Sequence, residues 1–144
     1  MPARWTVLAS GSGGNASLLE LDGTGLLVDI GLGPRQLDRR LQDVGSGWDR
    51  IRGVVLTHTH SDHWSARSLA RLAELRVPFF CHAEHLRPLN RECPEFQGLQ
   101  FAGLVKTYSP GRTFEPVPGA CCRALALKHD GGATFGFRIE AEAS

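Results

Sequence analysis

The sequence predicts one domain of α/β to α+β class, in which helices cover one face of a β-sheet. Its 144 residues match the usual size of a single domain. Hydrophobic residues make up 42% of the chain and charged residues 22%, proportions typical of a folded globular protein. Short apolar runs bounded by turn residues alternate with segments of helical spacing. Because no repeat or linker divides these segments, we expect a single domain over residues 1–144.

Strands are predicted at the N-terminus by three short apolar stretches, separated by runs of Ser, Gly, Asn, Thr and Asp: Trp5 to Ala9, Ala16 to Leu21 and Gly25 to Ile30. A helix is predicted next, because Pro34 suits a first helical turn and Gly45 suits a C-terminal stop. Between them, apolar residues recur at i, i+4 and i+7, at Leu37, Leu41 and Val44. This segment is expected to be an amphipathic helix.

The middle of the chain predicts a strand, a helix and a second strand. The mostly apolar run from Ile51 to Thr57 is typical of a buried strand whose C-terminal end opens into a loop. Leucines share one side of the segment from Ala66 to Leu75, which predicts a helix, and Val77 to Cys81 predicts a short strand. The second half is more strand-like, with apolar residues of one parity at Leu99, Phe101 and Val105, and again at Phe135, Phe137 and Ile139.

Charge and apolar patterning exclude several classes of protein. Sixteen Lys and Arg oppose fifteen Asp and Glu, so the composition gives no argument for bulk DNA or an anionic membrane surface as a partner. No apolar run approaches the roughly eighteen residues of a membrane span, and the N-terminus lacks the apolar core of a signal peptide. The four cysteines form no CxxC pair. We therefore expect a cytoplasmic protein with reduced thiols and no membrane partner.

The residues that carry chemistry lie in one run, His58-Thr-His-Ser-Asp-His63. His58 and His60 are two positions apart, so in an extended loop they project to one side and can bind one cation. Asp62 and His63 can offer an oxygen and a nitrogen to a second ion about 3.5 to 4 Å away. The pattern predicts a dinuclear metal centre. The alternatives are a solvated histidine-rich loop, or histidines that are satisfied by hydrogen bonds.

This run, placed after Val54-Val-Leu-Thr57, resembles the signature of the metallo-β-lactamase superfamily. Leu26-Leu-Val-Asp29 resembles the strand-end aspartate of that superfamily. The opening Leu8-Ala-Ser-Gly-Ser-Gly-Gly-Asn15 is similar to the YycJ/WalJ-type branch, whose members resemble phosphodiesterases and DNA exonucleases. The similarity extends to Leu127-Lys-His129-Asp130 and the following Phe135-Gly-Phe137.

The resemblance implies a fold, a cofactor and a role for each site residue. The fold would be a metallo-β-lactamase-like αββα sandwich, and the cofactors two divalent ions, Zn²⁺ or Mn²⁺. Asp29 would orient the histidine loop through hydrogen bonds. Asp62 would serve in catalysis as well as in metal binding. The implied ligands are His58, His60 and His129 for the first ion, and Asp62 and His63 for the second.

The family pattern also includes ligands that the sequence as given does not contain. An aspartate that bridges both metals, and a last histidine on the second, follow the third histidine in the family, whereas this sequence stops at Ser144. We therefore expect about the N-terminal half of the sandwich, from a truncated or partial reading frame, with one ion bound. Phe135, Phe137 and Ile139 are then expected to lie partly uncovered, which would leave the chain marginally stable.

The implied activity is that of a metal-dependent hydrolase, a phosphodiesterase or 5′-3′ exonuclease-like enzyme. A metal-bound water with its pKa lowered toward about 7 would supply hydroxide that attacks a phosphodiester, with DNA as substrate on the branch resemblance alone. One alternative is a non-catalytic truncated or pseudoenzyme fragment that binds metal. Another is a different reaction on the same scaffold, such as thioester hydrolysis or redox chemistry at iron.

Three further features have two interpretations each. Cys81-His82-Ala-Glu-His85, with Cys93, offers the ligand types of a structural zinc site, although the absence of CxxC favours packing roles. Gly11-Ser-Gly-Gly14 could cradle a phosphate, but a tight loop that forms the floor of the active site is favoured. Trp64, next to His63, either packs in the core or lines the substrate cleft.

Overall fold

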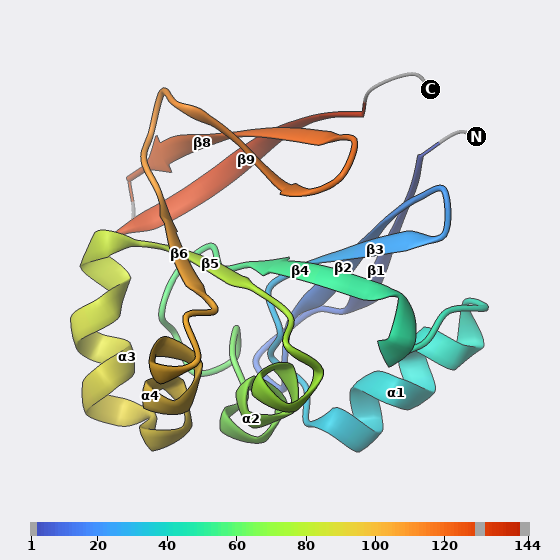
Figure 1. The fold of residues 1–144 in the computed structure, drawn as a ribbon, viewed down its shortest axis with the longest axis horizontal. Coiled ribbons are helices and arrows are strands. Elements are labelled where there is room, and N and C mark those ends of the chain that lie inside the picture. The colour runs from blue at the N-terminus through green and yellow to red at the C-terminus, as the bar shows by residue number, and fades with distance from the viewer. Residues whose placement is uncertain (1–2, 129–131, 142–144) are drawn as a thin grey trace.

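The computed structural model describes residues 3–128 and 132–141 and places two β-sheets face to face, with helices on the outer side of the larger sheet (Figure 1). The larger sheet has six strands in sequence order: β1 (Arg4–Ala9), β2 (Ala16–Leu21), β3 (Thr24–Val28), β4 (Ile51–Val55), β5 (Phe79–His82) and β6 (Val105–Tyr108). The smaller, antiparallel sheet contains β7 (Thr113–Val117), β8 (Ala120–Leu127) and β9 (Thr134–Ala141). The predicted α/β class, with helices on one face, is confirmed.

The larger sheet is antiparallel from β1 to β3 and parallel from β3 to β6. Parallel neighbours need crossover connections, and the helices supply them. Between β3 and β4 these are α1 (Pro34–Asp43) and η1 (Trp48–Arg50), and between β4 and β5 it is α2 (Ala66–Leu75). Between β5 and β6 they are η2 (Ala83–His85), α3 (Leu86–Glu92) and α4 (Pro94–Phe101). None of the helices in the described ranges has the length and apolar content that a membrane crossing requires.

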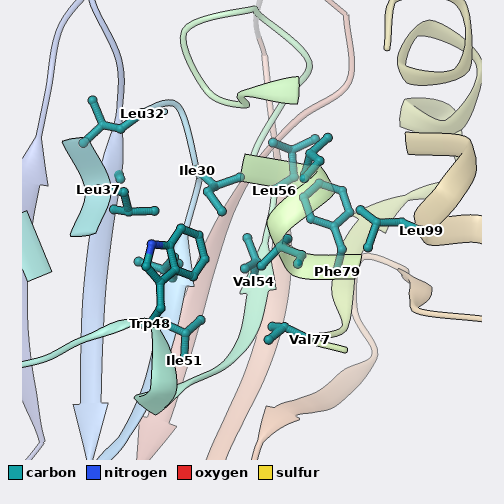
Figure 2. Packing of buried hydrophobic residues seen from close by; sticks show 14 of the residues in the cluster. Ile30, Leu32, Leu37, Trp48, Ile51, Val54, Leu56, Val77, Phe79 and Leu99 are labelled. Carbon is teal, nitrogen blue, oxygen red and sulfur yellow. The ribbon is translucent and has the colours of Figure 1, made fainter. Parts of the chain in front are cut away.

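The main core lies between the larger sheet and the helices. Val54 from β4 and Phe79 from β5 are fully buried there, and Figure 2 shows them between Ile30 and the helical residue Leu99. Burying such side chains contributes roughly 1.5 to 3 kcal/mol each. This core fixes the parallel strands side by side, so their C-terminal ends meet at one edge.

A second core lies between the two sheets, formed by residues such as Val55 from β4 and Cys122 from β8. Gly53 allows this approach, because a Cβ atom there would lie 2.6 Å from the Pro116 carbonyl oxygen of β7. A side chain at position 53 would therefore push β7 away from β4.

Two expectations about the second half are wrong. Leu99 and Phe101 belong to helix α4 rather than to a strand, and only Val105 begins one, because Pro94 starts a helix in which residues two apart lie on nearly opposite faces. Leu99 is consequently buried while Phe101 is 97% exposed. Phe135 is buried rather than partly uncovered, since it packs against Tyr108. Phe137 and Ile139 are half-buried and line a groove of about 330 Å³ with Trp5 and Leu19.

Two phenylalanines provide a matched test of this packing. Phe79→Ala should lower the free energy of unfolding by about 3–5 kcal/mol, because it leaves a cavity between sheet and helices. Phe101→Ala should change it by less than about 0.5 kcal/mol, because the ring touches little. Urea denaturation followed by circular dichroism measures both values. Equal losses in the two variants would contradict the placement of α4.

Candidate metal centre

Polar side chains gather where the parallel strands end. Asp29 directly follows β3, Thr57 and His58 follow β4 after one buried leucine, and His82 ends β5. The C-terminal ends of parallel strands share one edge of a sheet, which is where α/β proteins build their sites. The fold therefore brings Asp29, the loop 57–63 (the histidine loop) and the segment 82–85 to the same edge.

Backbone hydrogen bonds hold the histidine loop against its neighbours. The Ile30 N–H donates to the carbonyl of His63 at 2.9 Å, and the Phe135 N–H of β9 donates to the carbonyl of Thr57 at 3.0 Å. Within the loop, the His63 N–H donates to the His60 carbonyl at 2.9 Å. The ring of His58 consequently lies 3.9 Å from that of His63 and 4.7 Å from that of His60, measured between centroids. Three imidazoles are thus packed at one point.

Asp29 is the buried anchor of this arrangement. Asp29 is only 5% exposed. Its φ of 65° lies in the left-handed region, and this conformation turns the chain sharply at the end of β3. Its Oδ1 accepts from the Thr57 N–H at 2.8 Å. Its Oδ2 accepts from the Thr57 hydroxyl at 2.8 Å and is paired with His63 Nδ1 at 2.6 Å. Asp29 therefore ties β3 to both ends of the histidine loop.

These contacts decide which nitrogen each histidine can present to a cation. The single hydroxyl proton of Thr57 goes to the Asp29 carboxylate, so His58 Nδ1 must donate to Thr57 Oγ1, at 2.9 Å. His63 Nδ1 likewise donates to Asp29. In neutral His58 and His63, the lone pair is then on Nε2. The same carboxylate thus sets the tautomer of both rings, one directly and one through Thr57.

Asp62 and His63 form a pair suited to one ion. Asp62 Oδ1 lies 3.7 Å from His63 Nε2. Two ligands bound to one ion at about 2.0–2.2 Å in tetrahedral geometry are about 3.4 Å apart. The donor types and the separation therefore fit a divalent cation with little movement of either side chain.

The structure brings together five of the six residues predicted for the site: Asp29, His58, His60, Asp62 and His63. The sixth, His129, lies outside the described residues. Within the described ranges, no group of three or more His, Cys, Asp or Glu is placed to hold an ion. Two of the ligands proposed for each ion are among the described residues: His58 and His60 for one, and Asp62 and His63 for the other. The remaining ligands of each ion would come from other residues. Sequence reasoning missed Thr57, for which the signal is a hydroxyl residue directly before the first histidine.

The environment of His63 favours its protonated form. Burial alone would lower its pKa, but the hydrogen bond and the charge of Asp29, with a contribution from Asp62, outweigh burial and raise the pKa above its ordinary value. A metal ion binds the neutral ring, so protons compete with the ion at this position. Metal affinity should therefore rise with pH.

Asp29→Asn should lower the pKa of His63 in the metal-free protein, because the substitution removes the charge that stabilises the imidazolium. It should also lower the free energy of unfolding by about 1.5–3 kcal/mol, the contribution of hydrogen bonds to a charged group. NMR titration of the His63 ring measures the first effect and urea denaturation the second. Asp43→Asn, at an exposed position in α1, is the control. An unchanged His63 pKa in Asp29→Asn would contradict the tautomer assignment.

The Cys81, His82, His85 and Cys93 segment is not arranged as a zinc site. Burial raises the pKa of the Cys81 thiol to about 12, which keeps the thiol protonated. Both nitrogens of His85 are engaged, since Nδ1 accepts from the His82 N–H at 3.0 Å and Nε2 lies 2.8 Å from the Ala133 carbonyl. His85 instead joins the segment 82–85 to the start of β9.

His85 should make folding sensitive to acid. Burial lowers its pKa, with a smaller contribution from His82, so the unfolded chain takes up a proton at higher pH than the folded chain. The free energy of unfolding should fall as pH drops below about 6.5, the ordinary histidine pKa. His85→Gln should show a shallower fall between pH 7 and pH 5.5 in urea denaturation. Parallel curves for the two proteins would contradict this role.

A cleft of about 450 Å³ opens beside the histidine loop, lined by residues that include His60, Glu84, Arg91 and Ala133. Trp64 packs against the main core and donates from Nε1 to the Thr59 carbonyl at 2.9 Å, so it supports the loop from behind. The cleft therefore borders the histidine loop at His60 and the segment 82–85 at His85.

Comparisons with known proteins agree with this architecture. A family model described as "Beta-lactamase superfamily domain" matches residues 24–144. Exodeoxyribonuclease WalJ of Streptococcus pneumoniae is 37% identical over 60 residues, which are 42% of this chain and 22% of that protein. Exodeoxyribonuclease YycJ of Bacillus anthracis is 36% identical over 78 residues, 54% of this chain and 30% of that protein. The matched stretch thus spans less than a third of either relative.

Solved structures show the same fold at lower identity. A diphosphatase from the PhnP family aligns with a TM-score of 0.69 and 20% identity, over 96% of this chain and 62% of that one. Zn²⁺-bound PqqB from Methylobacterium extorquens aligns with a TM-score of 0.68 and 21% identity, over 95% and 61%. MEM-A1, a subclass B3 metallo-β-lactamase from a soil metagenome library, gives a TM-score of 0.69 at 14% identity, over 98% and 55%. The chain spans about three-fifths of the length of these structures.

Proposed function

The chain belongs to the metallo-β-lactamase superfamily, a superfamily of metal-dependent hydrolases, and on that premise we propose that it carries the metal centre of a phosphodiesterase that acts on DNA. The substrate class rests on the exodeoxyribonucleases WalJ and YycJ, which are 36–37% identical over the matched stretches. The lactamases among the similar structures are 14–19% identical, which supports the fold alone. Phosphodiester cleavage is therefore favoured over lactam hydrolysis.

The observation that carries the proposal is the hydrogen-bond network of Asp29. Because this network engages Nδ1 of both His58 and His63, Nε2 is the nitrogen with which each ring would bind an ion. His58 belongs to the proposed ligands of one ion and His63 to those of the other. A solvated loop or a purely structural histidine cluster does not need a buried carboxylate that fixes two tautomers. The proposed ligands are His58, His60 and His129 for one ion, and Asp62 and His63 for the other.

The ligand chemistry fits divalent zinc or manganese, which when bound supply hydroxide near neutral pH and stabilise the charge that develops on a phosphoryl oxygen. The chain's own residues perform the remaining tasks. Asp29 and Thr57 orient the two rings so that Nε2 is the nitrogen that would bind an ion, and Asp62 brings a carboxylate beside His63. Along the cleft, Arg91 is largely exposed and lies 3.9 Å from Glu92, and its guanidinium can contact a phosphate of the substrate strand.

His129 is supported as a ligand by the residues that follow it. The Phe135 N–H donates to the Thr57 carbonyl, and Ala133 is joined to His85. Gly132 and Ala133 line the same cleft as His60. The start of β9, at Thr134, therefore lies against the histidine loop, five residues beyond His129 in the chain.

Metal analysis and hydrolysis test the proposal, with the chain taken together with any residues that follow Ser144 in its gene. The purified protein should retain zinc or manganese and hydrolyse bis(p-nitrophenyl) phosphate and linear DNA. Asp62→Ala should lower kcat/KM by more than about 100-fold, because removing a ligand costs more than changing its hydrogen-bond partner. His58→Ala should release metal.

Asp43→Ala, at an exposed position in α1, is the control and should retain both metal and activity. A protein that retains metal without cleaving either substrate would overturn the phosphodiesterase assignment. Unchanged metal content in His58→Ala would overturn the ligand assignment.

A further inference from the structure

The turn between β1 and β2 makes direct contact with the proposed metal ligand Asp62. The Asn15 backbone N–H donates to the Asp62 carbonyl oxygen at 2.7 Å. The Asn15 side-chain Nδ2 lies 3.2 Å from the same carbonyl oxygen and 3.1 Å from Asp62 Oδ2. These two residues are 47 positions apart in the sequence, so the contact exists only in the folded chain.

The carboxamide of Asn15 is itself held in one orientation. Its Oδ1 accepts from the Gly11 N–H at 3.1 Å, while its Nδ2 donates to the Gly11 carbonyl at 2.9 Å. Because an N–H must meet the amide oxygen and not the NH₂ group, the Gly11 contacts fix which end of the amide is which. The donor end of the amide therefore faces Asp62.

The backbone around the contact between Asn15 and Asp62 is closely packed, which holds the two residues in place. The Gly31 N–H donates to the Asn15 carbonyl at 2.8 Å. A Cβ atom on Gly31 would lie 2.0 Å from the Asp62 carbonyl oxygen and 2.7 Å from the Asn15 nitrogen. The glycine is thus required by space, and three chain segments meet at the Asp62 backbone.

The consequence concerns the two oxygens of the Asp62 carboxylate. Asn15 occupies Oδ2, and this leaves Oδ1 on the side of His63, at 3.7 Å from Nε2. We propose that Asn15 is a positioning residue, which orients Asp62 so that Oδ1 and His63 Nε2 face one ion. This inference rests on the proposed metal centre and adds a residue to it, since Asn15 acts through Asp62 and not on the substrate.

A double-mutant cycle read by metal binding tests this role. Co²⁺ binding, followed by calorimetry and by the absorption of the bound ion, is measured for the wild type, Asn15→Ala, Asp62→Ala and the double variant. Asn15→Ala should weaken one binding step by about 10 to 100-fold, as is typical when a ligand loses its hydrogen-bond partner. In the Asp62→Ala background, Asn15→Ala should have little further effect. Equal effects in both backgrounds, or none in either, would overturn the proposal.

A measurement on the metal-free protein addresses the contact directly. The side-chain NH₂ resonances of Asn15 should shift in Asp62→Ala and stay in place in Asp43→Ala. Asn15→Asp, which keeps the acceptor for Gly11 but replaces the donor with a carboxylate oxygen, should weaken Co²⁺ binding as Asn15→Ala does. Unshifted resonances, or wild-type Co²⁺ binding in Asn15→Asp, would overturn the positioning role.

The outcomes separate this inference from the proposed function. If the protein binds Co²⁺ and the Asn15 and Asp62 substitutions are coupled, but neither DNA nor bis(p-nitrophenyl) phosphate is hydrolysed, only the phosphodiesterase proposal is overturned. Hydrolysis that depends on Asp62, with no coupling to Asn15, would overturn the positioning role alone. A wild-type protein that binds no Co²⁺ would overturn both.

Discussion

The site depends on one buried carboxylate. Asp29 accepts two hydrogen bonds from Thr57 and pairs with His63, so it joins the end of β3 to the histidine loop that follows β4. A charge in such a position is costly unless it is fully hydrogen-bonded, and here both oxygens have partners. The positive φ of Asp29 lets the chain leave β3 and aim the carboxylate back across the sheet edge.

The rest of the fold positions the C-terminal strand ends that form this site. Helices α1 and α2, packed on one face, hold β3, β4 and β5 parallel, so that their C-terminal ends deliver Asp29, His58 and His82 to the same side. The smaller sheet covers the other face, and Gly53 permits its close approach. From the smaller sheet, the Phe135 N–H donates to the Thr57 carbonyl and so holds the start of the histidine loop.

Two kinds of similarity bear on function in different ways. The solved structures share the architecture at 14–21% identity, and enzymes of different chemistry are among them, so they establish the fold and leave the reaction open. The exodeoxyribonucleases share a shorter stretch at 36–37% identity. The DNA substrate is drawn from them, whereas the metal chemistry is drawn from the geometry of the histidine loop.

Sequence patterns predicted the strands up to β5, helices α1 and α2, and the gathering of Asp29 with the histidine loop, because periodicity and local spacing are properties of short segments. They failed at α4, where apolar residues of one parity, Leu99 and Phe101, also fit a helix that buries only Leu99. The HxHxDH run by itself predicted the ligand types. Only the tertiary structure decided that Thr57 fixes the tautomer of His58 and that Asn15 holds Asp62. Those contacts join residues from different strand ends, and their partners are set by how the sheet brings the ends together rather than by any spacing along the chain.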